Sequence, residues 1–146
     1  EYCVFKWPND YWNEDWGPDI VKKISLINFD SFIFTIYGIQ INPDGCIVAK
    51  GYDEGESIFK IREYMKNELH FLPQKQSGWA HVPLGRILEP IGESKFLKLK
   101  QLFYDFQDIN IVSCSINSIE YVHEKQWYME KKNILFSHKL INSNEK

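Results

Sequence analysis

Apolar and β-branched positions along the chain predict several β-strands. Residues 31–41 (SFIFTIYGIQI) are rich in β-branched and aromatic side chains, which is typical of a strand. The turn signal Asn-Pro-Asp-Gly at residues 42–45 returns residues 46–50 as the second arm of a hairpin. Further strands are expected at residues 2–7, 79–84, 110–115, 118–124 and 133–139. The strands at 110–115 and 118–124 are either continuous or broken near Asn117.

Apolar residues at helical spacing predict two amphipathic helices. Residues 56–69 carry one apolar stripe, formed by Ile58, Ile61, Met65 and Leu69. Ser94 suits the N-cap of a second helix that runs to Phe106, and Pro18 suits the first turn of a helix that ends near Leu26. The order of elements predicts an α+β fold with a mainly antiparallel sheet. We expect helices 56–69 and 94–106 to pack on the sheet that contains residues 79–84.

Length and cysteine content narrow the class of protein. A chain of 146 residues matches one domain, over residues 1–146. Whether an amino-terminal segment is missing stays open, because the chain begins on an apolar stretch without Met. Its three cysteines, none at C-x-x-C spacing, argue against a disulfide framework or a cysteine zinc site and favour a reducing, cytoplasmic compartment. No apolar run approaches the ~20 residues that span a bilayer, so we expect no membrane partner.

Charge and aromatic content bear on the kind of ligand. The net charge of −3 argues against binding to long nucleic acid, which usually requires a basic face. A phosphate-bearing ligand would therefore be small or bound locally, and the chain has only two arginines, Arg62 and Arg86, to bind it. Aromatic residues make up 16% of the chain, enough for core packing and also for stacking on bases or sugars.

The segment around His81 combines groups that suit phosphate chemistry. His81 and Pro83 share one face of the predicted strand, and Pro83 should make that strand irregular or place it at a sheet edge. Arg86 follows directly, so an imidazole that moves a proton lies near a guanidinium that can bind phosphate oxygens. Trp127 and Tyr128 could form a wall that stacks on a base, or could simply pack against the sheet edge.

The stretch AHVPLGRIL resembles the second motif of the two-histidine (2H) phosphoesterase superfamily, which includes the 2'-5' RNA ligase-like proteins. That motif is His-x-Thr or His-x-Ser before an apolar residue, and some members continue with Gly-Arg. With the helices on either side, the resemblance covers roughly residues 30–140. It implies the 2H phosphoesterase fold, an intracellular hydrolase that opens cyclic phosphodiesters or cleaves 2',5' linkages, His81 as a catalytic acid or base, and no metal or cofactor.

Two departures from the family pattern leave the activity open. Pro83 occupies the hydroxyl position, and no first His-x-Thr/Ser motif is visible, because His70, His123 and His138 do not match it. The leading interpretation is a 2H phosphoesterase-like domain that acts on or binds a nucleotide or RNA end. The main alternative is a non-catalytic nucleotide-binding, RNA-binding or protein-interaction module of the same fold. A third is an unrelated α+β domain in which His81 is structural.

Overall fold

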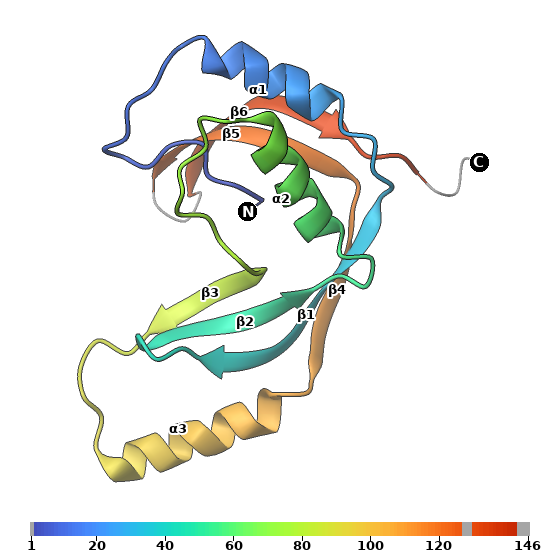
Figure 1. Cartoon of the computed structure of the whole chain (residues 1–146). Coiled ribbons are helices and arrows are strands. Elements are labelled where there is room, and N and C mark those ends of the chain that lie inside the picture. Colours follow the sequence, from blue (N-terminus) through green and yellow to red (C-terminus); the bar gives the residue numbers. More distant parts are fainter. Residues whose placement is uncertain (1, 127–129, 143–146) are drawn as a thin grey trace. The chain divides into compact units, whose positions relative to one another are not determined.

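The computed structural model describes residues 2–126 and 130–142 and has an α+β fold (Figure 1). Its helices and strands, in chain order, are α1 (Trp16–Ser25), β1 (Phe32–Ile41), β2 (Cys46–Tyr52), α2 (Ser57–Glu68), β3 (His81–Arg86), α3 (Glu93–Phe106), β4 (Asn110–Ile116), β5 (Ser118–Gln126) and β6 (Lys131–Lys139). The chain divides into two compact units. The first comprises Glu1–Phe32, Ser57–Ser77 and Ser115–Lys146, and the second comprises Ile33–Glu56 and Gly78–Cys114.

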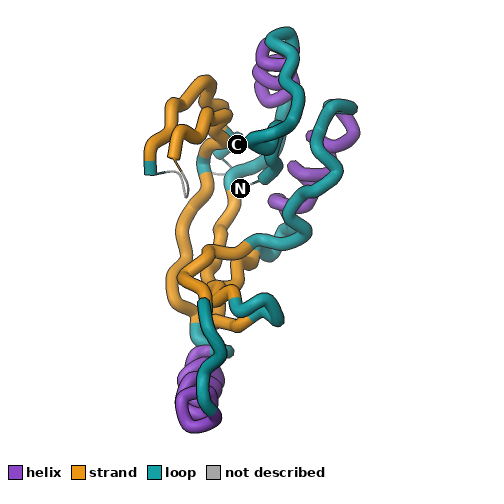
Figure 2. Tube along the Cα trace, turned by 90° about the vertical axis from the view of Figure 1, so that its left-hand side faces the viewer, coloured by secondary structure: helices purple, strands orange, loops and turns teal. Residues whose placement is uncertain are grey.

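In the first unit, α1 and α2 pack with the antiparallel hairpin of β5 and β6. Figure 2 shows these strands on one side and the two helices on the other. The core consists of side chains that are at most 8% exposed: Ile20, Ile24, Ile27, Ile61, Met65, Leu69, Ile119, Tyr121 and Leu140. The apolar stripe predicted for α2 is confirmed, because all four of its residues are buried. Burial of this stripe stabilises the helix against the hairpin.

The second unit contains a four-stranded sheet in the order β3-β2-β1-β4. β1 and β2 form the predicted antiparallel hairpin, and β2 pairs antiparallel with β3. β3 is an edge strand, as Pro83 predicts, because proline cannot donate to a further strand. The segments 110–116 and 118–126 are separate strands, since β4 and β5 belong to different sheets.

The prediction that both helices pack on the sheet of β3 is wrong, because α2 shares its core with β5 in the first unit and α3 does not cover the sheet. None of the residues of α3 is buried, and Phe96, Leu97 and Leu102 are each about half exposed. The apolar residues Phe96, Leu99, Leu102, Phe103 and Phe106 do share one side of α3 at 100° per residue, but even Leu99 and Phe103 are only half-buried. Ser94 is not its N-cap either, because the helix begins at Glu93 with Gly92 in the cap position.

The predicted strand at residues 2–7 is also wrong, because this segment is a loop. Side chains, rather than a neighbouring strand, satisfy its backbone groups. The amide of Gln76 bonds both the N–H and the carbonyl of Val4, at 2.9 and 2.8 Å. Arg62 Nε donates to the carbonyl of Tyr2 at 2.8 Å. These bonds provide the partners that a sheet would otherwise provide.

Candidate functional site

His81 lies at the start of β3, directly opposite Lys50 of β2. Residues that face each other across an antiparallel pair project their side chains from the same side of the sheet, with Cβ atoms ~4.5–5.5 Å apart. The imidazole of His81 and the aliphatic part of the Lys50 side chain are therefore cross-strand neighbours. The sequence places Lys50 in the hairpin but does not reveal this pairing, so Lys50 was missed as a candidate site residue.

A bulge in β3 brings Arg86 to the same face as His81. Gly85 pairs with Ile47 and Pro83 pairs with Val48, which leaves Leu84 as an extra residue. In a regular strand, residues five apart lie on opposite faces. Here Arg86 pairs with Cys46 and His81 with Lys50, and residues 46 and 50 share a face of β2. The bulge therefore reverses the alternation and turns the guanidinium toward the face of the imidazole.

The same register separates a polar face of the sheet from an apolar one. We call polar face the side that carries Thr35, Gln40, Lys50, His81 and Arg86, although Cys46, Tyr52, Pro83 and the fully buried Val48 lie on the same side. The other face carries Ile36, Ile39, Ala49 and Val82. The candidate groups thus share one side of the sheet, where Lys50 and His81 are half-buried and Arg86 is exposed.

The ring of His81 is held by the indole of Trp79. The two rings stack with centroids 4.4 Å apart and planes inclined by 21°. Nδ1 of His81 is buried and has no hydrogen-bond partner among the described residues. The half-buried imidazole is thereby fixed with Nδ1 enclosed, which leaves Nε2 as the ring nitrogen that can reach a ligand.

Contacts along the polar face position the ammonium of Lys50. Its Nζ donates to the carbonyl of Gln107 at 3.4 Å and lies 5.9 Å from the centroid of the Tyr37 ring. Both contacts come from the side of the sheet away from β3. The positive charge therefore lies beside β1, while its stem passes the position opposite His81.

Arg86 lies at the opposite end of β3 from His81. Their pairing partners, Cys46 and Lys50, are four positions apart on β2, which corresponds to about 13 Å at ~3.3 Å per residue. Its Nη2 donates to Oδ2 of Asp44 at 3.0 Å, in an ion pair whose side chains are both more than half exposed. Arg86 is thus paired at the turn end of the hairpin. Trp127 and Tyr128, the predicted stacking residues, lie outside the described residues.

In the described part of the chain, no group of three His, Cys, Asp or Glu side chains could hold a metal ion. None of the helices in residues 2–126 and 130–142 is long and apolar enough to cross a membrane. Comparison of the chain with protein-family models gives no match, and comparison with curated proteins gives none either.

Proposed function

We propose that this chain is a 2H phosphoesterase-like domain that binds or acts on a nucleotide or RNA end, as a cyclic phosphodiester or a 2',5'-linked substrate. The observation that carries the proposal is the cross-strand pair of His81 and Lys50 on the polar face, with Arg86 turned to that face by the bulge. The likeness of AHVPLGRIL to the second motif of the superfamily supports the same assignment.

Each group has a role that follows from its chemistry. Lys50 neutralises charge on the non-bridging oxygens of a phosphodiester, as a cation beside a phosphate does. His81 exchanges a proton through Nε2 with the attacking or the leaving oxygen. Arg86, about 13 Å away along the strand, contacts a further phosphate of an oligonucleotide rather than the reacting one. A mononucleotide therefore depends on Lys50 and His81, and a longer ligand depends on Arg86 as well.

A second candidate function is binding without turnover. The side chains of the polar face, among the described strand pairs, include no second histidine and no carboxylate. Pro83 also lacks the hydroxyl that would contact a phosphate oxygen. Opening a phosphodiester usually needs an acid as well as a base. These observations favour a module of the same fold that binds the nucleotide or RNA end and releases it unchanged.

The test measures binding and hydrolysis of 2',3'-cyclic AMP and of 2',5'-linked diadenosine by the 146-residue chain. His81→Ala should weaken binding of both ligands and remove any hydrolysis. His70→Ala is the matched control, because His70 is an exposed histidine of the first unit and should bind like wild type. Failure of the wild-type chain to bind either ligand, or binding that is unchanged in His81→Ala, would refute the proposal.

A further inference from the structure

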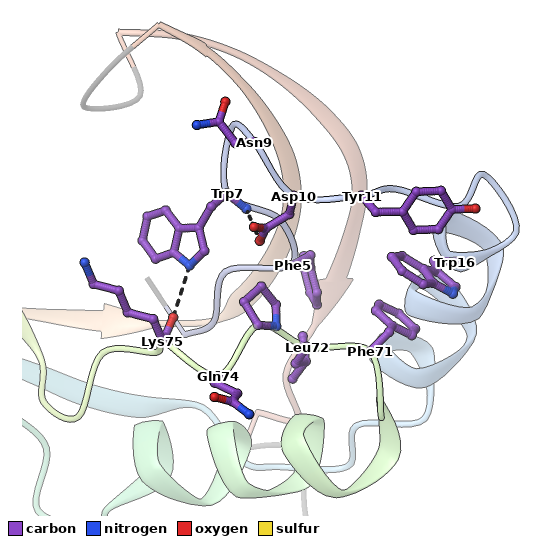
Figure 3. Close-up of a pocket in the computed structure, with 11 residues that line it drawn as sticks. Phe5, Trp7, Asn9, Asp10, Tyr11, Trp16, Phe71, Leu72, Gln74 and Lys75 are labelled. Atoms are coloured by element: carbon purple, nitrogen blue, oxygen red, sulfur yellow. Dashed lines mark hydrogen bonds between the residues drawn. The ribbon is translucent and has the colours of Figure 1, made fainter.

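The first unit contains an aromatic groove of about 660 Å³ (Figure 3). It lies between the loop that precedes α1 and the loop that follows α2. We call it the aromatic groove; it is lined by Phe5, Trp7, Asn9, Asp10, Tyr11, Trp16, Phe71, Leu72, Pro73, Gln74 and Lys75. Its volume is within the range of sites for small organic ligands, roughly 300–1,000 Å³. None of these residues belongs to the polar face around His81.

Hydrogen bonds fix one end of the aromatic groove. The indole N–H of Trp7 donates to the carbonyl of Lys75 at 3.2 Å, which joins the two loops. The backbone N–H of Trp7 donates to Oδ2 of Asp10 at 3.0 Å. The indole nitrogen of Trp7 is thus already hydrogen-bonded within the protein. Its ring is in turn covered in part by Lys75, whose Nζ lies 5.8 Å from the ring centroid.

Stacked aromatic rings form the other end. Trp16 and Phe71 are parallel, with centroids 4.4 Å apart and an interplanar angle of 1°. Tyr11 meets Trp16 edge-on at 5.7 Å and 89°. Tyr11 is nevertheless 76% exposed, so the contact with Trp16 orients its ring and leaves most of the side chain accessible. In Figure 3 these rings lie on the side of the groove opposite Trp7.

The polar side chains of the groove suit an uncharged ligand with donors and acceptors on its edge. Asp10 and Lys75 contribute one negative and one positive charge, so the lining has no net charge. Asn9 and Gln74 add amides, each of which can both donate and accept. Flat aromatic surfaces combined with such edge-reading groups are how proteins bind unpaired bases of single-stranded RNA.

We propose that the aromatic groove binds an unpaired nucleobase, and this choice of ligand rests on the proposed function. The base stacks on Tyr11 or Trp7, and its edge bonds to the amides and to Asp10. The phosphate of the nucleotide stays outside, because a lining without net charge gives it no attraction. The groove therefore selects for bases, while the polar face selects for phosphates.

The test measures binding of adenosine, which has no phosphate, to the full chain by calorimetry. Tyr11→Ala should weaken binding roughly 5- to 150-fold, the range expected for loss of one stacking ring. Tyr11→Phe keeps the ring and should retain wild-type affinity. Tyr104→Ala, which removes a 66% exposed tyrosine on α3, is the matched control and should change nothing. Because Tyr11 is exposed, none of these variants should impair folding.

The outcomes separate this proposal from the proposed function. No binding of adenosine, or equal binding by Tyr11→Ala, would overturn the nucleobase proposal, as would binding of maltotriose or a polyproline peptide in its place. If Lys50→Met loses binding of 2',3'-cyclic AMP while Tyr11→Ala binds adenosine as tightly as wild type, only the nucleobase proposal for the groove is overturned. Adenosine binding that requires Tyr11, together with cyclic-nucleotide binding indifferent to Lys50 and His81, would support the groove and overturn the site on the polar face.

Discussion

Lys50 and His81 face each other across the antiparallel pairing of β2 and β3, so a flexible cation and a fixed imidazole share one face of the sheet. Stacking on Trp79 fixes the imidazole. The ammonium, held by the Gln107 carbonyl at 3.4 Å, ends an unbranched stem that can move toward a ligand. This pair separates charge neutralisation from proton transfer, and each role can be tested by a single substitution.

Lys50→Met should weaken binding of 2',3'-cyclic AMP by ~10- to 100-fold, because one charge-assisted contact to the phosphate is lost. Met keeps most of the length and apolar surface of the stem, so the sheet should remain intact. Lys98→Met, at an exposed position of α3, is the matched control and should bind like wild type. Added salt should weaken binding by the wild-type chain more than binding by Lys50→Met. Equal affinities of the two lysine variants would argue against a phosphate at Lys50.

Hydrolysis by this chain should be weak or absent even where binding is measurable. One general acid or base typically contributes ~10²–10⁴ in rate, and the polar face offers only one histidine among the described strand pairs. Pro83→Thr supplies the missing hydroxyl but no second acid or base, so it should not restore the rate. Product formation from 2',3'-cyclic AMP, followed by chromatography, checks this. Robust turnover that disappears in His81→Ala would mean that a second acid or base lies near His81.

Asp44→Asn should tighten binding of a 2',5'-linked triadenylate but not of a mononucleotide. The substitution removes the charge that pairs with Arg86 and leaves the guanidinium available to a second phosphate. Asn retains Oδ1, which accepts the Cys46 N–H at 3.0 Å, so the turn should persist. The ion pair is exposed and worth at most about 1 kcal/mol, so stability should hardly change. The gain should vanish in the double variant with Arg86→Gln; a gain that persists there would exclude Arg86 as its cause.

Leu69→Ala should destabilise the first unit by about 2–5 kcal/mol, the usual cost of removing a large aliphatic side chain from a packed core. Leu69 is 1% exposed and belongs to the core that joins α1, α2 and β5. Leu97→Ala, at a 54% exposed position of α3, is the matched control and should cost far less. Urea unfolding measures both. Equal losses would mean that α3 is buried against something in solution.

Local signals made the β1–β2 hairpin and α2 predictable. The Asn-Pro-Asp-Gly turn needs only four consecutive residues, and the stripe of α2 needs only helical spacing. The segment 2–7 has the composition of a strand but no strand to pair with, because Gln76 and Arg62 occupy its backbone groups. Composition cannot reveal that competition, since the competing side chains are 60 and 72 residues away in the sequence.

The candidate site was predictable only in part for the same reason. His81 was found from its neighbours in sequence, whereas Lys50 becomes a candidate only through the register between β2 and β3. The side of the sheet to which Arg86 points depends on the bulge at Leu84. Strict alternation along the strand would place Arg86 on the opposite side from His81. The stacking role of Trp127 and Tyr128 stays a prediction, because both lie outside the described residues.

Alkaline pH should destabilise the first unit through Tyr121, whose pKa is raised above its ordinary value of 10 by burial and, to a smaller extent, by the carboxylate of Glu14. The folded chain then keeps the phenol proton at pH values where the unfolded chain loses it. The stabilising contribution is complete below about pH 10 and is lost as the pH rises toward the folded pKa. We expect the free energy of unfolding, measured with urea, to fall as the pH rises from about 9 to about 11. Tyr121→Phe should lose less stability over this interval, because its buried ring has no proton to release.

Tyr104→Phe is the control, because it removes an exposed hydroxyl outside this core and should behave like wild type. An undiminished loss in Tyr121→Phe would assign the alkaline effect to another group, of which Tyr64 is the first to test, since burial raises its pKa as well.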